Sequence, residues 1–468
     1  MASDDLTTRN KDYSVYIPSM QINSSENICS DALRWQAATL PNALTPSDFN
    51  YLRSANNYWT YKYALASAEK FKGKRRNSVT TKDSRAFILG DSGGFQIGRG
   101  TFGEAKTWKG YTRDELISAW YGSSLRDDII RWCETNCTYA MTIDIPLWVN
   151  RPKEKNSPFR VCSTQDLIDI TVDNLKHLQR RRGYWTRGEH SCKYLNVLQG
   201  DSGADEDMWF KAVRGFKLDG WSFAGGVGTD GGPYRILRRL LKLADAKLLD
   251  DGYDWVHLLK LGIPIWSPLI TAMQRSIRKH INPKFTISYD SSSAYQIAGK
   301  TEAYYWIGQL TEDASTWTLK TEKFPTSFAY ANHNKDISLS TSFCTGVGCR
   351  LCAANEPHLP AALRSPIAMH LSVQQLVSNT ENFARRRVKK LFEETLVNHN
   401  VYTVVDAMIR ANEAVHGTKQ KAPQQLIDAC GVIDDLFANS KNWLGRLDKN
   451  RKLLEGAVRY NQPKYVVD

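Results

Sequence analysis

The sequence predicts an α/β fold whose main body is a (β/α)8 barrel. From residue 85 onward, short apolar segments alternate with amphipathic helical segments, which is typical of parallel strands joined by crossover helices. A polar or glycine residue follows most of these strands, as expected when an active site is built from loops at the carboxyl ends of barrel strands. A length of 468 residues fits such a barrel with insertions. In the competing architecture, an open doubly wound sheet, the functional residues would instead cluster at one switch point.

Apolar runs and helix-start signals define the individual strands and helices. The expected strands are residues 85–89, 137–143, 194–198, 221–224, 255–261 and 285–289. The expected helices are residues 112–136, which begin at a capping box of Thr112 and Glu115, and then 163–182, 206–216, 234–249 and 268–281. Residues 14–20 and 338–343 are the candidates for the two missing strands, while 31–40 and 48–71 carry helical spacing.

Charge and cysteine usage narrow the class of protein. The formal net charge is +13, which favours a polyanionic partner, and nucleic acid is the first expectation. The first residues lack the apolar core of a secretory signal, and the sequence has no run of about eighteen apolar residues of the kind that crosses a membrane. The nine cysteines are widely spread except for one cluster, so a disulfide framework is not expected. We therefore expect a cytoplasmic protein.

The most informative segment is Leu89-Gly-Asp-Ser-Gly-Gly-Phe-Gln96, which sets a carboxylate among glycines directly after a strand. Asp91 is a candidate site residue. Gly93 and Gly94 let a ligand come close to the backbone, and Phe95 offers a flat face for a planar ring. The alternative is a glycine turn capped by Asp91. The same arrangement recurs along the chain, because other strand ends carry Asp144, Gln199, Gly225, Gly226 and Asp290.

These side chains suit chemistry at a sugar bearing a purine-like base. One ionised aspartate can attack the anomeric carbon and form a covalent glycosyl enzyme, while a second aspartate hands a proton to the leaving group. The remaining aspartate, the glutamine and a glycine N–H form an array suited to the edge of a guanine-like base, which has N–H donors beside a carbonyl acceptor.

In this order and at these spacings, the motifs resemble those of the tRNA-guanine transglycosylases and their DNA-modifying relatives, phage and bacterial enzymes that place 7-deazaguanines in DNA. The resemblance covers about residues 85–388. The matching segments are Asp91-Ser-Gly-Gly-Phe-Gln96, Met141-Thr-Ile-Asp144, Val197-Leu-Gln-Gly200, Ala224-Gly-Gly226, His257-Leu-Leu-Lys-Leu-Gly262 and Tyr289-Asp290.

The resemblance implies a zinc-containing barrel that acts as a base-exchange transglycosylase, a pentosyltransferase of the bacterial or phage-infected cytoplasm. Asp290 would be the nucleophile on C1′ and Asp91 the general acid and base. Asp144 and Gln199 would bind the edge of the base, and Phe95 would stack on its ring. The remaining base-binding positions implied by the resemblance are Gly94, Gly225, Gly226, whose N–H would meet O6 of the base, and Leu259.

Two departures from the family bear on the substrate. Members acting on tRNA usually follow the nucleophile with a Pro-Thr-Arg type loop, whereas this chain has Ser291-Ser-Ser-Ala-Tyr-Gln-Ile-Ala-Gly299. DNA is therefore the expected polymer and tRNA the alternative, with a free 7-deazaguanine base such as preQ0 as second substrate. Lys260 stands where an apolar residue usually covers the base, so Leu259 or Leu261 is expected to take that place.

The cysteine cluster predicts a structural zinc site. Cys344, Cys349 and Cys352, with His370 at the start of a helix, supply three thiolates and an imidazole, a tetrahedral zinc set. The family has such a site after its nucleophile, although its first two cysteines are usually closer together. His358 is the rival fourth ligand, and unligated buried thiols are the alternative to zinc.

Four parts are expected: an N-terminal strand and helical addition (1–84), the catalytic barrel (85–336), an inserted zinc-binding subdomain (337–371) and a C-terminal helical region (372–468). The last region has a basic stretch at residues 385–390, and its helices either clamp a duplex or pack on the barrel. A homodimer is left open. A second functional class is a non-catalytic zinc-containing nucleic-acid-binding subunit, but the presence of Asp91, Asp144 and Asp290 together argues against it.

Overall fold

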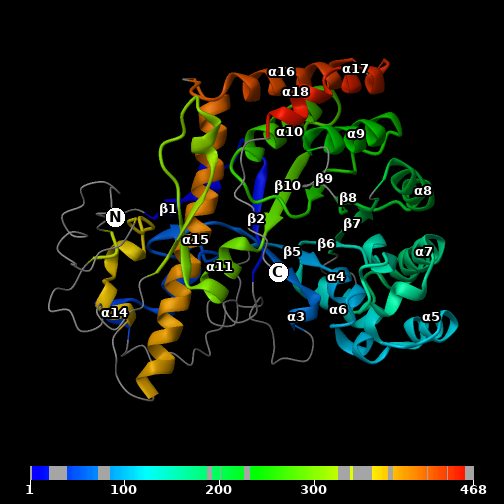
Figure 1. Cartoon of the computed structure of the whole chain (residues 1–468), viewed down its shortest axis with the longest axis horizontal. Helices are drawn as coiled ribbons and strands as arrows, with labels where there is room; N and C mark the ends of the chain where they lie inside the picture. The colour runs from blue at the N-terminus through cyan, green and yellow to red at the C-terminus, as the bar shows by residue number, and fades with distance from the viewer. Residues whose placement is uncertain are drawn as a thin grey trace.

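The centre of the molecule is an eight-stranded parallel sheet that curls into a nearly closed barrel (Figure 1). The computed structural model describes residues 3–20, 40–71, 85–186, 192–200, 202–225, 232–324, 338–340, 361–377, 383–418, 420–439 and 441–458. The strands are β2 (Val15–Pro18), β4 (Tyr63–Ser67), β5 (Phe87–Asp91), β6 (Tyr139–Met141), β7 (Lys193–Leu198), β8 (Gly220–Phe223), β9 (Trp255–Leu258) and β10 (Thr286–Ser291). They lie around the sheet in chain order, and a parallel bridge between Ser19 and Leu65 joins β2 to β4. This is the architecture expected of a (β/α)8 barrel.

The structure confirms the six expected strands from residue 85 onward and the first candidate strand, which is β2. The second candidate is wrong, because Ser338 forms only an isolated antiparallel bridge to Ser372 and residues 341–343 lie outside the described residues. The eighth strand is β4, inside the stretch 48–71 that we expected to be helical. Only the short α3 (Ala68–Phe71) at its end is a helix.

The prediction failed at β4 because this strand is buried on both faces. Its residues alternate between the barrel interior, which takes Tyr63 and Leu65, and the layer under the helices, which takes Ala64 and Ala66. A strand covered on both faces is apolar throughout and lacks the alternation that marks a half-exposed strand. The barrel therefore begins N-terminal to the expected boundary at residue 85.

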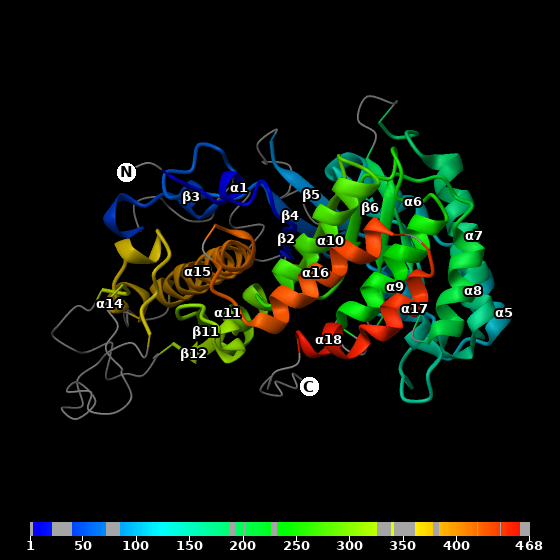
Figure 2. The ribbon, with the colours of Figure 1, turned by 90° about the horizontal axis from the view of Figure 1, so that it is seen from above.

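Helices cover the outside of the barrel (Figures 1 and 2). They are α5 (Arg113–Gly122), α6 (Leu125–Asn136), α7 (Thr164–Arg181), α8 (Gly203–Val213), α9 (Gly232–Asp245), α10 (Trp266–His280) and α11 (Ser293–Thr301), while the short α4 (Gly94–Gly98) directly follows β5 at its carboxyl end. The capping box at Thr112 is present, but the expected helix 112–136 is divided into α5 and α6 at Ser123 and Ser124. The expected helix 31–40 lies almost wholly outside the described residues.

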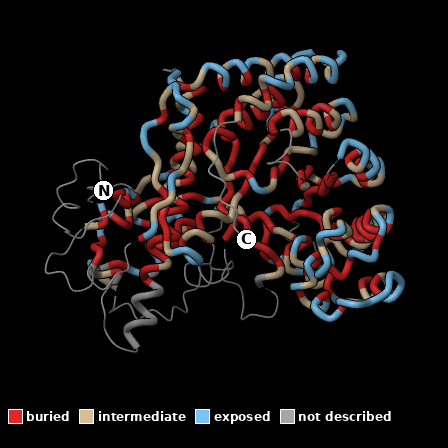
Figure 3. The backbone as a smooth tube through the Cα atoms, in the orientation of Figure 1, coloured by how far each residue is buried: buried red, intermediate tan, exposed pale blue. Residues whose placement is uncertain are grey.

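Side chains fill the barrel interior below its carboxyl-end mouth. Aromatic rings close the amino-terminal end of the barrel, where the ring centroids of Phe87 and Trp255 are 4.7 Å apart and those of Tyr139 and Trp255 are 5.0 Å apart. Aliphatic side chains such as Val197 and Leu89 fill the space above them. In Figure 3 the strands are buried along most of their length. In the described part of the chain the amino-terminal end is thus closed, so a ligand is expected at the carboxyl ends of the strands.

The C-terminal helices pack on the barrel, which is the second of the two arrangements considered for them. The long helix α15 (Phe383–His416) lies against α10 and α11, and α16 (Gln424–Ala438) lies along α10 (Figure 2). The side chains of the basic stretch 385–390 are outside the described part of α15. The remaining described strands and α-helices are α1 (Leu6–Arg9), β1 (Asp4–Asp5), β3 (Trp59–Thr60), β11 (Ala303–Trp306), β12 (Lys320–Lys323), α14 (Val373–Val377), α17 (Trp443–Lys449) and α18 (Arg451–Gly456). Among the helices that the structure describes, none is both long enough and apolar enough to span a bilayer.

Candidate active site

The expected polar residues come from four different strands and meet at the mouth of the barrel. Asp91 ends β5, Asp290 lies near the end of β10, and Asp144 and Gln199 follow β6 and β7. Side chains alternate along a strand, so Asp91 lies on the same inner face as Leu89, whose side chain packs in the barrel interior. The parallel arrangement therefore places these groups at one end of the barrel.

Asp144 and Gln199 form a buried pair. Asp144 is 6 % exposed and Gln199 is 4 % exposed, and the Gln199 amide nitrogen donates a hydrogen bond to Asp144 Oδ2. Burial raises the pKa of Asp144 to about 7, against the opposing effect of the Gln199 hydrogen bond, and the nearby charge of Asp91 adds to the rise. Near neutral pH this carboxyl group exchanges readily between its ionised and protonated forms. It can therefore accept a hydrogen bond from a ligand in one form and donate one in the other.

Glycines let the backbone approach the two carboxylates. Gly93 has φ +80°, a conformation that favours glycine, and its N–H donates to Asp91 Oδ1 at 3.0 Å. A β-carbon on Gly94 would lie 2.7 Å from the carbonyl oxygen of Asp144 and 3.0 Å from its carboxylate. A β-carbon on Gly225, which has φ +68°, would lie 3.1 Å from the Gly200 carbonyl oxygen and 3.2 Å from Gln199 Oε1. Gly226 is outside the described residues.

Asp290 is held through one of its two carboxylate oxygens. The backbone N–H of Lys260 donates to Asp290 Oδ1 at 3.0 Å, and His257 Nε2 lies 3.4 Å from the same oxygen. Lys260 has φ +65°, a left-handed conformation that is unusual for a residue with a side chain. This conformation directs its N–H to the carboxylate. Within the described residues, the polar contacts of the Asp290 side chain leave Oδ2 unengaged.

Phe95 is 39 % exposed and lies beside two cations at the mouth. Lys260 Nζ and Arg99 Cζ each lie 4.9 Å from the centre of the Phe95 ring, and the Trp148 ring centroid is 5.1 Å away. These are cation–π distances. Because Lys260 also contacts Asp290, it connects the β9 side of the mouth to α4. Phe95 and Asp290 therefore lie at the same opening.

Of the two leucines expected to cover a base, Leu259 is better placed. It is half-buried and packs against the cluster inside the barrel, at the end that opens to the mouth. Leu261 is buried in the outer core, and its backbone N–H donates to the Asp290 carbonyl oxygen at 2.8 Å.

The expected zinc ligands are not brought together in the described residues. Cys344, Cys349, Cys352 and the rival ligand His358 lie outside them, and the described part of the chain contains no group of three or more metal-ligating side chains. His370 is the last residue of a short 3-10 helix and is exposed. Its ring lies edge-on to the Tyr58 ring, with the two ring centroids 5.0 Å apart.

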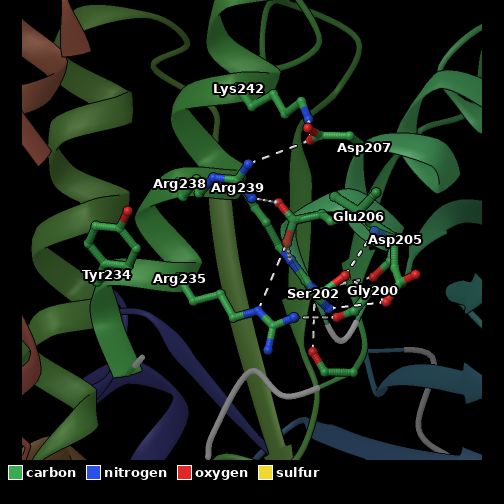
Figure 4. Close-up of polar contacts among 12 residues, drawn as sticks. Gly200, Ser202, Asp205, Glu206, Asp207, Tyr234, Arg235, Arg238, Arg239 and Lys242 are labelled. Atoms are coloured by element: carbon green, nitrogen blue, oxygen red, sulfur yellow. Dashed lines mark hydrogen bonds and ion pairs between the residues drawn. The ribbon is translucent and has the colours of Figure 1, made fainter. Parts of the chain in front are cut away.

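Sequence reasoning missed a buried ion pair that supports the site (Figure 4). Arg239 on α9 is fully buried, and its Nε is 3.0 Å from Glu206 Oε2. The same guanidinium donates to the carbonyl oxygens of Leu198, Gly200, Ala224 and Gly225. It thus fixes the carboxyl ends of β7 and β8 on either side of Gln199. Its position three residues after Ile236, on the apolar face of α9, is the one signal in the sequence that could have indicated burial.

A second feature missed by sequence reasoning is a polar layer beneath Asp290. His257 pairs in register with Ser222 on β8 and with Ser288 on β10, and all three are buried. Each of these residues alternates with apolar residues along a short strand, and this pattern does not show that the three share one layer of the barrel.

Comparison of the chain with protein-family models and with curated proteins finds no match.

Proposed function

We propose that the protein is a transglycosylase that exchanges guanine in DNA for a 7-deazaguanine base. The observation that carries this proposal is the meeting of Asp91, Asp290 and the Asp144–Gln199 pair at one mouth of an eight-stranded parallel barrel. Such a set supplies a nucleophile, a proton carrier and a base-recognition pair at the same opening.

In the proposed reaction, Asp290 attacks C1′ of the target nucleotide. The bond from C1′ to the guanine nitrogen breaks, an ester bond to Asp290 forms, and Asp91 gives its proton to the departing guanine. The incoming 7-deazaguanine then attacks C1′ and displaces the Asp290 carboxylate, and its ring N–H proton returns to Asp91. Atoms and charge balance, because one base replaces another on the same sugar.

Base recognition is assigned to the Asp144–Gln199 pair and to the glycine backbone. A guanine edge presents N–H donors beside a carbonyl, so a carboxylate oxygen and an amide oxygen are suitable acceptors and a glycine N–H is a suitable donor. Phe95 offers an exposed ring on which the base can stack. Both bases share this edge, so one site serves the leaving and the entering base.

The segment after the nucleophile supports DNA over tRNA as the polymer. Residues 293–301 form α11, whose Ala294, Tyr295 and Ala298 are buried, and which packs against α15. This segment contains no arginine, and it is a packed helix where tRNA enzymes of the resembling family carry an arginine-bearing loop. In duplex DNA the target nucleotide has to be flipped into the mouth, at a cost of a few kcal/mol. The net charge of +13 favours the phosphate contacts that offset this cost.

A structural zinc ion is part of the proposal. Cys344, Cys349, Cys352 and His370 form a donor set of three thiolates and an imidazole, which suits a closed tetrahedral site. When bound, the zinc would stabilise residues 337–371, and no step of the reaction involves it.

The test is exchange of labelled guanine in double-stranded DNA and in bulk tRNA, side by side at matched salt, with preQ0 as the free base. We expect release from DNA by the wild type and none by Asp290→Asn, since an amide cannot act as the anionic nucleophile. Exchange in tRNA with none in DNA would establish the tRNA alternative. Binding of nucleic acid with no exchange in either polymer would establish the non-catalytic subunit.

A further inference from the structure

We propose that His257 is a positioning residue that holds Asp290 Oδ1, so that Oδ2 is the oxygen that attacks the sugar. This inference rests on the proposed function, because it concerns the nucleophile of that reaction. It assigns a role to a side chain that is wholly buried and lies beneath the mouth.

The position of His257 follows from the register of three adjacent strands. His257 on β9 is paired with Ser222 on β8 and with Ser288 on β10. Trp255 and Leu259, two residues before and after it on β9, both pack in the barrel interior. Since side chains two residues apart share a face, His257 also points inward, just below Asp290.

Hydrogen bonding fixes which ring nitrogen of His257 carries the hydrogen. The Trp255 indole N–H donates to Ser288 Oγ at 2.7 Å, and Ser288 Oγ is 2.9 Å from His257 Nδ1. Tryptophan only donates, so the Ser288 hydroxyl keeps its own hydrogen for Nδ1. The opposite assignment, in which Nδ1–H donates to Ser288, would leave a buried hydroxyl hydrogen without an acceptor. His257 therefore carries its hydrogen on Nε2.

His257 Nε2 lies beside the nucleophile. Nε2 lies 3.4 Å from Asp290 Oδ1 and has no hydrogen-bond partner in the described part of the chain. The same Oδ1 already accepts the N–H of Lys260 at 3.0 Å. One N–H thus donates to this oxygen and His257 Nε2 lies beside it, an arrangement that leaves Oδ2 for C1′. A small movement on substrate binding suffices to bring Nε2–H and Oδ1 to hydrogen-bonding distance.

This arrangement has a consequence for the second half of the reaction. When Oδ2 is esterified to the sugar, Oδ1 becomes the ester carbonyl oxygen, and negative charge returns to the carboxylate as the incoming base displaces it. The N–H groups on Oδ1 stabilise that charge as it develops. Loss of His257 should therefore lower kcat far more than it changes KM for either base.

The chain offers a graded set of variants for the test. His257→Leu removes the donor, whereas His257→Gln keeps an N–H close to the position of Nε2. Ser288→Ala removes the group that fixes the tautomer. Ser222→Ala is the matched control, because Ser222 lies in the same layer and its buried hydroxyl has no partner among the described residues.

We expect kcat for base exchange to fall on the order of a hundredfold in His257→Leu, with KM within about twofold, since misplacing a reacting group costs that much. His257→Gln should recover most of the rate, Ser288→Ala should fall between them, and Ser222→Ala should match the wild type. Wild-type kcat in His257→Leu overturns the inference, as does an equal loss in Ser222→Ala. If His257→Leu does not fold, His257→Gln and Ser288→Ala decide, and unchanged kcat in Ser288→Ala overturns it.

A readout independent of activity separates this inference from the proposed function. In protein labelled with 15N-histidine, the His257 nitrogen shifts should report the Nε2–H tautomer in the wild type and a loss of that preference in Ser288→Ala. An Nδ1–H tautomer in the wild type overturns the inference even if exchange occurs. The expected tautomer in a protein that exchanges no base sinks the proposed function and leaves the arrangement of His257 and Asp290 intact.

Discussion

Gly94 lies so close to Asp144 that a β-carbon at position 94 would be 2.7 Å from the Asp144 carbonyl oxygen. This contact joins the glycine loop after β5 to the buried carboxyl after β6. The two expected functional segments therefore lie side by side at the mouth.

The first prediction concerns this contact. Gly94→Ala should displace Asp144 from Gln199, weaken binding of the free base and lower stability by about 1–3 kcal/mol, the usual cost of overpacking. Thermal unfolding and calorimetric titration with preQ0 measure the two effects. Gly122→Ala is the control, because nothing lies within 4 Å of a β-carbon at that position. Unchanged base affinity in Gly94→Ala would show that this approach is not part of the base site.

The second prediction uses the raised pKa of Asp144. Its folded-state pKa of about 7 exceeds the ordinary value of 3.8, so between these pH values the folded protein binds a proton that the unfolded chain releases. Stability due to this group is therefore present at low pH and is lost as pH rises through about 7, by up to about 4 kcal/mol. Asp144→Asn removes that cost. It should raise the melting temperature at pH 8 and change it little at pH 4.

The same variant should lose base exchange, because Asn brings an NH2 donor to a place where the carboxylate offers only acceptors to Gln199 and to the N–H donors of the base. The stability comparison is independent of activity and needs only thermal unfolding of both proteins at the two pH values. An equal change in melting temperature at pH 4 and pH 8 would mean that Asp144 ionises normally in the folded protein.

The third prediction concerns the buried ion pair of Arg239 and Glu206 (Figure 4). Burial lowers the pKa of Arg239, and the charge of Glu206 opposes that effect. Glu206→Ala leaves a buried guanidinium unpaired and should destabilise the protein by about 3–5 kcal/mol. Asp207→Ala is the control. The Asp207 side chain is 55 % exposed and contacts Arg238 and Lys242, so its loss should lower stability by at most about 1 kcal/mol. Similar losses in both variants would contradict the assigned role of Glu206.

The order of polar residues after the strands was enough to predict that these side chains come together at one end of the barrel. Asp144 and Gln199, which are 55 residues apart, do form a hydrogen-bonded pair. The sequence was not enough for β4, whose double burial removes the alternation of a strand, nor for Arg239, whose partners come from separate strands. The layer of Ser222, His257 and Ser288 depends on strand register, and no local pattern in the sequence encodes register between strands.

The fourth prediction is one zinc ion per chain, bound by Cys344, Cys349, Cys352 and His370. Cys349→Ser should lower zinc content and melting temperature together, because metal binding contributes directly to folding free energy. Metal analysis of the purified proteins measures this, with His358→Ala as the control for the rival ligand. Zinc lost from His358→Ala but kept in His370→Ala would reverse the assignment of the fourth ligand. A wild type without zinc would remove the site altogether.

The last prediction concerns the cations around Phe95. Lys260 and Arg99 lie at the mouth, both are exposed, and neither forms an ion pair among the described residues. Under the proposed function they are placed to bind phosphates that flank a flipped nucleotide. Lys260→Ala removes the charge but keeps the backbone N–H that holds Asp290, so kcat at saturating DNA should stay close to that of the wild type. Binding should weaken, and the slope of log Kd against log salt should fall by about 0.9, the value for one lost phosphate contact.

Lys62→Ala is the matched control for Lys260→Ala. Lys62 Nζ also lies over an aromatic ring, 5.1 Å from the centroid of Tyr63, but Lys62 is beside the amino end of β4, away from the mouth. A fall in slope that is equal in both variants would mean that only net charge matters, and that the mouth itself does not contact the phosphates.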